Sequence, residues 1–153
     1  MPYIEILIES CNKAKNAEPI KEFILSDISK LNGIKKAIYI IEDMSNDNAA
    51  TFRQLSDYKA TKQRACPKLN TASSVMYVGS STTGVKKRIE QHLGIKSSKD
   101  TYALHLSHWF KGETKITIKI YDESVENEVL QIIEDALSHE LKPAFGKQGG
   151  NNK

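Results

Sequence analysis

The strictest pattern in this chain is residues 115–120 (KITIKI), in which isoleucine alternates with polar residues. Such alternation is typical of a strand with one buried face, so the isoleucines should point inward. Two runs rich in β-branched and aromatic residues, 37–41 (AIYII) and 75–78 (VMYV), predict two more strands. With the helical patterns described below, they predict an α+β fold: a small three-stranded antiparallel sheet flanked by helices.

Residues 1–33 are predicted to be a helical extension of this domain. Four apolar residues lie at the spacing of one helical face: Ile4, Leu7, Ile8 and Cys11. A second helix should begin near Pro19, because proline is tolerated in a first helical turn, and should end at Gly33. Neither helix carries a group suited to catalysis, so we expect them to extend the core or to offer a docking surface.

The rest of the chain is predicted to be a main domain with a short tail. Residues 34–147 contain the three strands, and residues 44–74 form a long insert between the first two of them. Helical patterns cover residues 49–64, 85–93, 101–110 and 125–141, the last with Ser124 as its N-cap. Residues 148–153 are rich in glycine and asparagine, so we expect a flexible tail there.

Positive charge is concentrated in the middle of the chain. Residues 51–115 hold 12 Lys and Arg against 4 Asp and Glu, a net charge of +8, whereas the whole chain carries only +3. A concentrated basic region attracts a polyanion such as a phosphate backbone. The alternative is a lysine-rich surface that only contacts solvent, and charge by itself does not decide between the two.

Composition points to an ordinary cytoplasmic protein. The chain has no apolar run long enough to cross a bilayer, so no membrane partner is expected, and its N-terminus lacks the pattern of a signal peptide. Its two cysteines, Cys11 and Cys66, are far apart and have no CxxC partner. They are therefore predicted to be free thiols and not a disulfide or a zinc site.

Two common catalytic patterns are excluded by their own requirements. The loop 79–84 (GSSTTG) resembles a phosphate-binding P-loop, but that motif needs a lysine directly after its second glycine. Val85 occupies that position, and a lysine displaced by one residue points about 100° away around a helix. The chain also has no GxSxG nucleophile elbow, and neither cysteine has a neighbouring histidine.

Arg88 and His92 are four residues apart on a predicted helix, so they should share one face. An arginine can bind a phosphate and an imidazole can move a proton, although a solvated basic face has the same spacing. Glu134 lies at the margin of the apolar stripe of the last helix, either as a surface residue or as a metal ligand. His105 and His108, without a nearby glutamate at zinc-ligand spacing, are predicted to be ordinary helix-face residues.

Four features, in their order along the chain, resemble the GIY-YIG nuclease family. They are residues 37–39 (AIY), residues 77–81 (YVGSS), the Arg88 and His92 pair, and a helix with Glu134 before a proline. The match covers residues 36–147. The resemblance implies a small sheet with both tyrosines on adjacent strands, the arginine on the next helix and the glutamate on a later helix. It also implies an endonuclease that hydrolyses phosphodiester bonds in DNA, and among the family's roles a restriction-like enzyme fits this chain best.

The resemblance also implies roles for five residues. Glu134 would hold one divalent ion, Mg²⁺ or Mn²⁺, which acts as a Lewis acid and template. Arg88 would neutralise charge that grows on the scissile phosphate. Tyr39 or Tyr77 would orient or deprotonate the attacking water, helped by the metal or by His92, and the identity of the general base stays open.

The chain departs from the family pattern at three places. Ala37 replaces the usual glycine, and no asparagine follows Pro143 closely, so its contact is either absent or supplied by Gln148, Asn151 or Asn152. The third departure is the long insert, which carries much of the basic charge. We expect six basic residues to contact nucleic acid: Lys59, Lys62, Arg64 and Lys68 in the insert, and Lys86 and Lys87 after it.

Two other functions are compatible with the sequence. The fold could belong to a nucleic-acid-binding module that has lost catalysis, an alternative supported by the absent asparagine. It could also serve protein interaction, with the N-terminal helices as the docking surface. The tyrosines, Arg88, His92 and Glu134 favour the nuclease, acting alone or as a homodimer.

Overall fold

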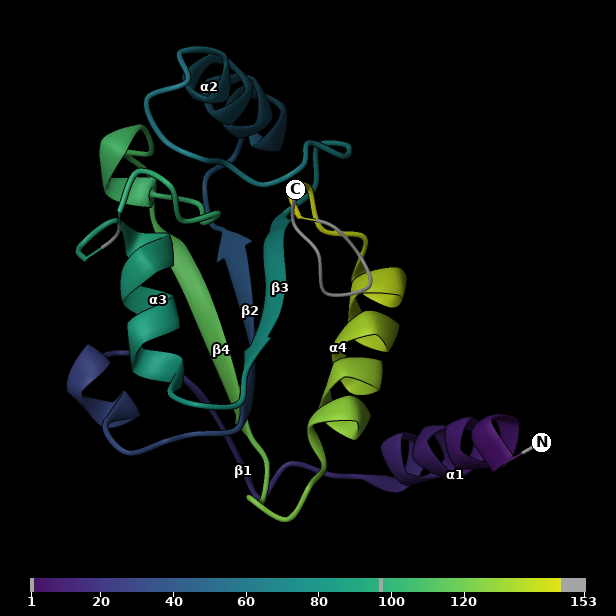
Figure 1. The fold of residues 1–153 in the computed structure, drawn as a ribbon. Helices are drawn as coiled ribbons and strands as arrows, with labels where there is room; N and C mark the ends of the chain where they lie inside the picture. Colours follow the sequence, from purple (N-terminus) through teal and green to yellow (C-terminus); the bar gives the residue numbers. More distant parts are fainter. Residues whose placement is uncertain (1, 97, 147–153) are drawn as a thin grey trace.

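The computed structural model describes residues 2–96 and 98–146, and its centre is one four-stranded sheet (Figure 1). The strands are β1 (Lys21–Ile24), β2 (Ala37–Asp43), β3 (Val75–Ser81) and β4 (Thr114–Ile120). Their order is β1-β4-β2-β3, and every neighbouring pair is antiparallel. The α+β class is confirmed, but the prediction of three strands was one too few.

Helices cover both faces of this sheet (Figure 1). On one face, α3 (Val85–Leu93) packs through Ile89 in a core that also contains Ile41 from β2. On the other face, α4 (Asn127–Leu141) packs through Leu130 against Ile38 and Ile40. Consecutive strand residues point to opposite faces, so β2 supplies side chains to both cores and is buried on both sides.

The fourth strand lies where a helix was expected. Residues 18–33 form β1 and a 3-10 helix, Ile28–Leu31, and not one continuous helix. Phe23 pairs with Ile118 of β4, so the hydrogen bonds of a sheet edge outweigh the local helical spacing. The side chain of Asp27 accepts from the backbone N–H of Ser29 and caps the 3-10 turn. Part of segment 1–33 therefore belongs to the sheet.

Helix α1 (Pro2–Asn16) forms as predicted, but its apolar stripe does not face the core. Ile4, Leu7 and Ile8 are 42–56% exposed, and Cys11 is exposed too. The helix instead packs on α4 near its buried Ser10, with an ion pair of 2.7 Å between Lys13 Nζ and Glu126 Oε1. The expectation that α1 extends the core was wrong, and its use as a docking surface stays a prediction.

The segment 101–110 is not the predicted helix, since only Leu106–His108 forms a 3-10 turn. His105 takes a left-handed backbone conformation with φ of 51°. Its buried ring lies 2.8 Å from the carbonyl oxygen of Thr101 and 3.0 Å from that of Ala65. These side-chain contacts take the place of helical hydrogen bonds. His105 is thus a buried residue that ties loops together, and not a helix-face histidine.

The other predicted elements form with shifted ends. Helix α2 (Asn48–Ala60) stops four residues earlier than expected, and α4 begins after Glu126 with no side-chain cap from Ser124. Strand β3 continues through Gly79 to Ser81, where a turn was expected. No helix in the described residues is long and apolar enough to span a membrane. The predicted tail, residues 148–153, lies outside the described residues.

Two isoleucine-to-alanine substitutions compare the core with α1. Ile41 is fully buried, so Ile41→Ala should lower the free energy of unfolding by about 2–5 kcal/mol in a urea titration. Ile8 is 56% exposed, so Ile8→Ala should change it by less than about 0.5 kcal/mol. An equal loss at both positions would mean that the exposed side of α1 is covered in solution.

Candidate active site

The register of β2 and β3 places both predicted tyrosines on one face of the sheet. Tyr39 pairs with Gly79, and Ile41 pairs with Tyr77, so the two tyrosines are diagonal neighbours. Their rings are nearly parallel, 8° apart in plane, with centroids separated by 6.2 Å. Both side chains are almost fully buried. Because β3 is an edge strand of the sheet, the pair lies beside an open edge.

Gly79 leaves the space into which the Tyr39 ring extends. A Cβ atom at position 79 would lie 2.3 Å from the Tyr39 hydroxyl oxygen and 2.5 Å from Cζ. Both distances are far below van der Waals contact, so any side chain here would displace the phenol. Gly79 is therefore required by the close approach of Tyr39, and not by a turn.

His92, on the last turn of α3, holds the hydroxyl of Tyr39. Its Nδ1 accepts a hydrogen bond of 3.1 Å from the backbone N–H of Leu104, and its Nε2 lies 3.0 Å from Tyr39 Oη. Burial, and then the charge of Arg88, holds the pKa of His92 well below its usual range, so the ring is neutral. A neutral ring that accepts at Nδ1 carries its proton on Nε2. His92 therefore donates to Tyr39 and does not accept its proton.

The proton on the Tyr39 hydroxyl is consequently free to point into the pocket. Burial, followed by the nearby Tyr77, raises the pKa of Tyr39 above its usual value, so this phenol is neutral. His92 also contacts the Tyr77 ring, with centroids 4.3 Å apart. The imidazole thus fixes the positions of both tyrosines.

Arg88 lies one helical turn before His92 and points to the same side of α3, as predicted. Its Nη2 donates a hydrogen bond of 3.3 Å to Tyr77 Oη and one of 2.8 Å to the backbone oxygen of Tyr102. Its Nη1 donates a hydrogen bond to the side chain of Gln91. Burial by itself would lower the pKa of Arg88, but the neighbouring phenols raise it overall. The guanidinium is a fixed positive charge at the wall of the pocket.

Glu134, from α4, completes the pocket from the other side of β3. It is only 8% exposed, and its Oε1 accepts a hydrogen bond of 2.5 Å from Ser80 Oγ while Oε2 accepts from Gln131. Burial raises the pKa of the Glu134 carboxyl, and the bonds from Ser80 and Gln131 oppose that rise. Among the described residues, no Lys or Arg forms an ion pair with it.

These groups line one pocket of about 210 Å³, hereafter the catalytic pocket, whose lining residues are Tyr39, Tyr77, Gly79, Ser80, Arg88, Gln131 and Glu134. His92 lies behind the tyrosines and reaches the pocket through Tyr39. All five residues that were predicted to be catalytic therefore meet, although they come from four separate segments. Ser80 and Gln131 were not predicted; Ser80 lies within the YVGSS motif, and Gln131 is one helical turn from Glu134.

The donors in this pocket fit a hard divalent cation. Carboxylate, hydroxyl and amide oxygens are the ligands that Mg²⁺ and Mn²⁺ prefer. Within the described part of the chain, no three His, Cys, Asp or Glu side chains gather to hold a metal by themselves. Magnesium usually binds through one or two carboxylates, with waters and substrate phosphates completing its shell. Glu134 suits that mode, because it is buried and has no cationic partner.

The six basic residues that were predicted to contact nucleic acid separate into three groups. Lys59, Lys62 and Arg64 line a pocket of about 460 Å³ together with Lys99, which was not predicted. Lys68 lines a different pocket, and Lys86 and Lys87 lie on α3. The structure thus brings three of the six together.

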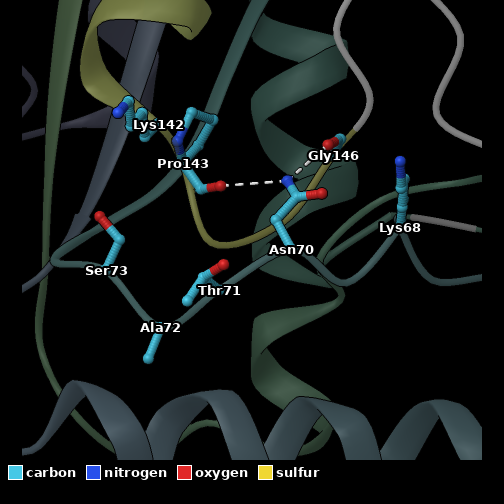
Figure 2. Close-up of a pocket in the computed structure, with 8 residues that line it drawn as sticks. All are labelled: Lys68, Asn70, Thr71, Ala72, Ser73, Lys142, Pro143 and Gly146. Carbon is cyan, nitrogen blue, oxygen red and sulfur yellow. Dashed lines mark hydrogen bonds between the residues drawn. The ribbon is translucent and has the colours of Figure 1, made fainter.

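Lys68 lines another pocket, of about 710 Å³, with Lys142 on its other side (Figure 2). Across it, the Asn70 side chain donates hydrogen bonds to the carbonyl oxygens of Pro143 and Gly146 and so holds the segment that follows α4 against the insert. This pocket contains none of the predicted catalytic residues, and Lys142 lies about 12 Å along α4 from Glu134. Residues 148, 151 and 152, considered for the absent asparagine contact, lie outside the described residues.

Comparison with models of protein families, with curated proteins and with solved structures found no match to this chain. The function of this chain is therefore inferred from the residues that line the pocket of Tyr39, Arg88 and Glu134.

Gly79→Ala tests the close approach of Tyr39 to the β3 backbone. The added methyl group must push the buried phenol away from His92, so we expect a loss of about 1–3 kcal/mol in the free energy of unfolding. Gly84→Ala is the matched control, since nothing lies within 4 Å of its added methyl group. Urea denaturation measures both, and equal stability of the two variants would contradict the packing described here.

The tautomer of His92 can be measured directly by NMR. We expect the Nε2-protonated neutral form to persist as the pH falls below about 6.5, the usual pKa of histidine. The folded pKa lies below the unfolded one, so the unfolded chain takes up more protons and stability should decrease as the pH falls through that range. A ring protonated on Nδ1 at neutral pH would contradict the assigned hydrogen bonds.

Proposed function

We propose that this chain is a metal-dependent endonuclease of the GIY-YIG type that hydrolyses phosphodiester bonds in DNA. The observation that carries the proposal is the convergence of Tyr39, Tyr77, Arg88, His92 and Glu134 on one pocket. Four separate stretches of sequence supply these residues. Packing by itself does not require a buried carboxylate, a partly buried guanidinium and two tyrosine hydroxyls to face the same small space.

Arg88 binds the scissile phosphate in this proposal. Its guanidinium is held by Tyr77, Gln91 and the Tyr102 carbonyl, so it needs no rearrangement when a phosphate enters. A preorganised cation stabilises the charge that develops on the phosphoryl oxygens more effectively than a mobile one. Tyr39, whose proton points into the pocket, donates a further hydrogen bond to the substrate.

Tyr77 is the better placed of the two tyrosines to receive a proton from the attacking water. Its oxygen already faces a guanidinium donor, which stabilises negative charge on a phenol. The Tyr39 oxygen instead faces the neutral imidazole of His92. Glu134 would hold a Mg²⁺ or Mn²⁺ ion, which supplies a water of lowered pKa and neutralises the phosphate. Ser80 and Gln131 orient the carboxylate for that purpose.

The alternative of a binding module that has lost catalysis explains this pocket less well. A module that only binds DNA gains nothing from a buried carboxylate, which repels a phosphate unless a cation lies between them. Glu134 is buried, ordered by two hydrogen bonds, and lies on the same pocket as Arg88. The arrangement therefore favours hydrolysis over binding alone.

Cleavage of supercoiled plasmid in Mg²⁺ or Mn²⁺ tests the proposal. We expect the parent protein to nick or linearise the plasmid, and we expect Glu134→Gln and Arg88→Ala to reduce the rate by at least about 100-fold. Glu140→Gln, an exposed change on the same helix, is the control and should cut normally. Binding without cutting by the parent in either metal would favour the binding module, and cutting that survives Glu134→Gln would exclude Glu134 as the metal ligand.

The stability that Glu134→Gln gains over the parent should grow as the pH rises. The pKa of Glu134 is higher in the folded chain than in the unfolded chain, so its ionisation costs stability. That cost is absent below about pH 4, where both states are protonated, and grows as the pH rises. We expect Glu134→Gln to raise Tm at neutral pH by a few degrees, since about 1 kcal/mol corresponds to about 2–4 °C in a chain of this size.

The same thermal measurement on Glu140→Gln provides the control, because residue 140 is exposed. Added Mg²⁺ should raise the Tm of the parent and leave that of Glu134→Gln unchanged. A parent and a Glu134→Gln variant with equal Tm at every pH would contradict the description of Glu134 as an ionised, buried group.

A further inference from the structure

A second pocket, of about 460 Å³, gathers basic side chains next to the catalytic pocket. We call it the basic pocket, and its charged lining residues are Lys59, Lys62, Arg64, Lys99 and Asp100. Four cations against one carboxylate leave an excess of three positive charges in a small space. The cations come from two segments that are far apart in sequence, so the cluster is not a run along one helix: residues 59–66, which span the end of α2 and the loop after it, and residues 98–102.

The three lysines of the basic pocket have hydrogen-bonding capacity to spare. Lys62 and Lys99 are exposed, and Lys59 donates to the Pro67 carbonyl, which uses one of its three N–H groups. In the described residues, none of the three forms an ion pair with a carboxylate. Several cations that repel one another in one hollow are stabilised when an anion binds there.

The backbone of Lys62 adds to this picture. It has a φ of 58°, a left-handed conformation that costs a lysine about 1–2 kcal/mol. The strain occurs at the end of α2, where the chain turns into the loop that lines the pocket. A left-handed residue just past a helix is a common way for the helix to end, and at Lys62 it directs the chain into the loop that lines the pocket.

Hydrogen bonds fix the position of the basic pocket relative to the catalytic pocket. The segment 98–105 is bonded to two catalytic residues, through the Tyr102 carbonyl to Arg88 and through the Leu104 N–H to His92. On the other side of this segment, the carbonyl oxygen of Lys99 accepts a hydrogen bond of 2.7 Å from the backbone N–H of Ala65.

His105 strengthens that connection. Its Nε2 lies within 3.0 Å of the carbonyl oxygens of both Ala65 and Thr101, which requires a proton on that nitrogen. One imidazole thus joins the insert to segment 98–105. Tyr102 belongs to both sites, because its carbonyl binds Arg88 while its residue lines the basic pocket. The two pockets are therefore adjacent and share one hydrogen-bonded wall.

We propose that the basic pocket binds a backbone phosphate of the same nucleic-acid strand whose scissile phosphate lies at Arg88. This inference rests on the proposed function and specifies its substrate: a polynucleotide long enough to reach both pockets. The basic pocket contacts phosphate, so it adds affinity that is independent of base sequence. Lys99 joins the binding surface, and Lys68, in the separate pocket of Figure 2, is not part of this phosphate site.

Salt-dependent binding tests the inference. Fluorescence anisotropy with a labelled DNA duplex, in EDTA to prevent cleavage, gives the slope of log affinity against log salt concentration. Each lost phosphate contact should reduce the steepness of that slope by about 0.9, and the pocket is proposed to bind one phosphate, so Lys62→Gln/Lys99→Gln should reduce it by roughly 0.9. The control, Lys15→Gln/Lys30→Gln, removes the same charge from exposed lysines outside the pocket and should keep the parent slope.

The outcomes separate this inference from the proposed function. Equal slopes for the parent and Lys62→Gln/Lys99→Gln, or equal reductions in that variant and its control, would overturn the phosphate site. If the parent still cuts plasmid in that case, the nuclease proposal stands without it. A parent that cuts no DNA in Mg²⁺ or Mn²⁺, with a slope that is reduced only in Lys62→Gln/Lys99→Gln, would overturn the nuclease proposal and leave the phosphate site to a binding module. Substitution of exposed lysines by glutamine leaves the fold intact, so a negative result is informative.

Discussion

The contact between the Tyr39 phenol and the backbone of Gly79 sets the geometry of the candidate site. It depends on the register of β2 and β3, which places a residue without a side chain directly opposite the tyrosine. With the phenol in that space, His92 reaches its hydroxyl, and Tyr77 stacks beside it. A shift of one residue in the register would turn both tyrosines to the opposite face of the sheet. The pocket therefore exists only in this pairing of the two strands.

A chain of hydrogen bonds extends from that contact to the surface. His92 receives the Leu104 N–H, Arg88 binds the Tyr102 carbonyl, and His105 joins the same segment to the insert. The insert is thus attached to the catalytic residues by polar contacts with directional geometry, not only by apolar packing. Such contacts preorganise a site because each group is already oriented before a ligand arrives. They also explain why His92 is neutral and buried, acting as a donor and not as a base.

Local patterns predicted the α+β class, the strands around residues 37–41, 75–78 and 115–120, and helix 85–93. The helical spacing of residues 20–31 was misleading, because pairing of Phe23 with β4 decides the structure of that segment. The failure at 101–110 has a similar cause, since His105 bonds with carbonyls that a helix would use. Tertiary contacts outweigh local propensity in both segments, and they are not visible in a single sequence.

The five catalytic candidates were predicted from their types and order in the sequence, and the structure brings them together. Contacts that depend on the fold were not predictable. Gly79 makes room for the Tyr39 ring, Ser80 donates to the Glu134 carboxylate, and Lys99 lines a pocket together with residues of the insert. Each joins residues that are distant along the chain. The separation of Lys68 from Lys62 and Lys99 has the same origin, because residues 59–66 and 68–73 of the insert line different pockets.

The central claim is that Glu134 binds a divalent cation. Its carboxylate is buried beside Arg88 and, in the part of the chain that the structure describes, forms no ion pair, so it is free to act as a ligand for a cation. Electron paramagnetic resonance of Mn²⁺ during a titration counts bound ions independently of catalysis. The account predicts one Mn²⁺ per chain in the parent and in the exposed control Glu140→Gln, and none in Glu134→Gln. Equal Mn²⁺ binding by the parent and Glu134→Gln, or no binding by the parent with DNA present, would contradict it.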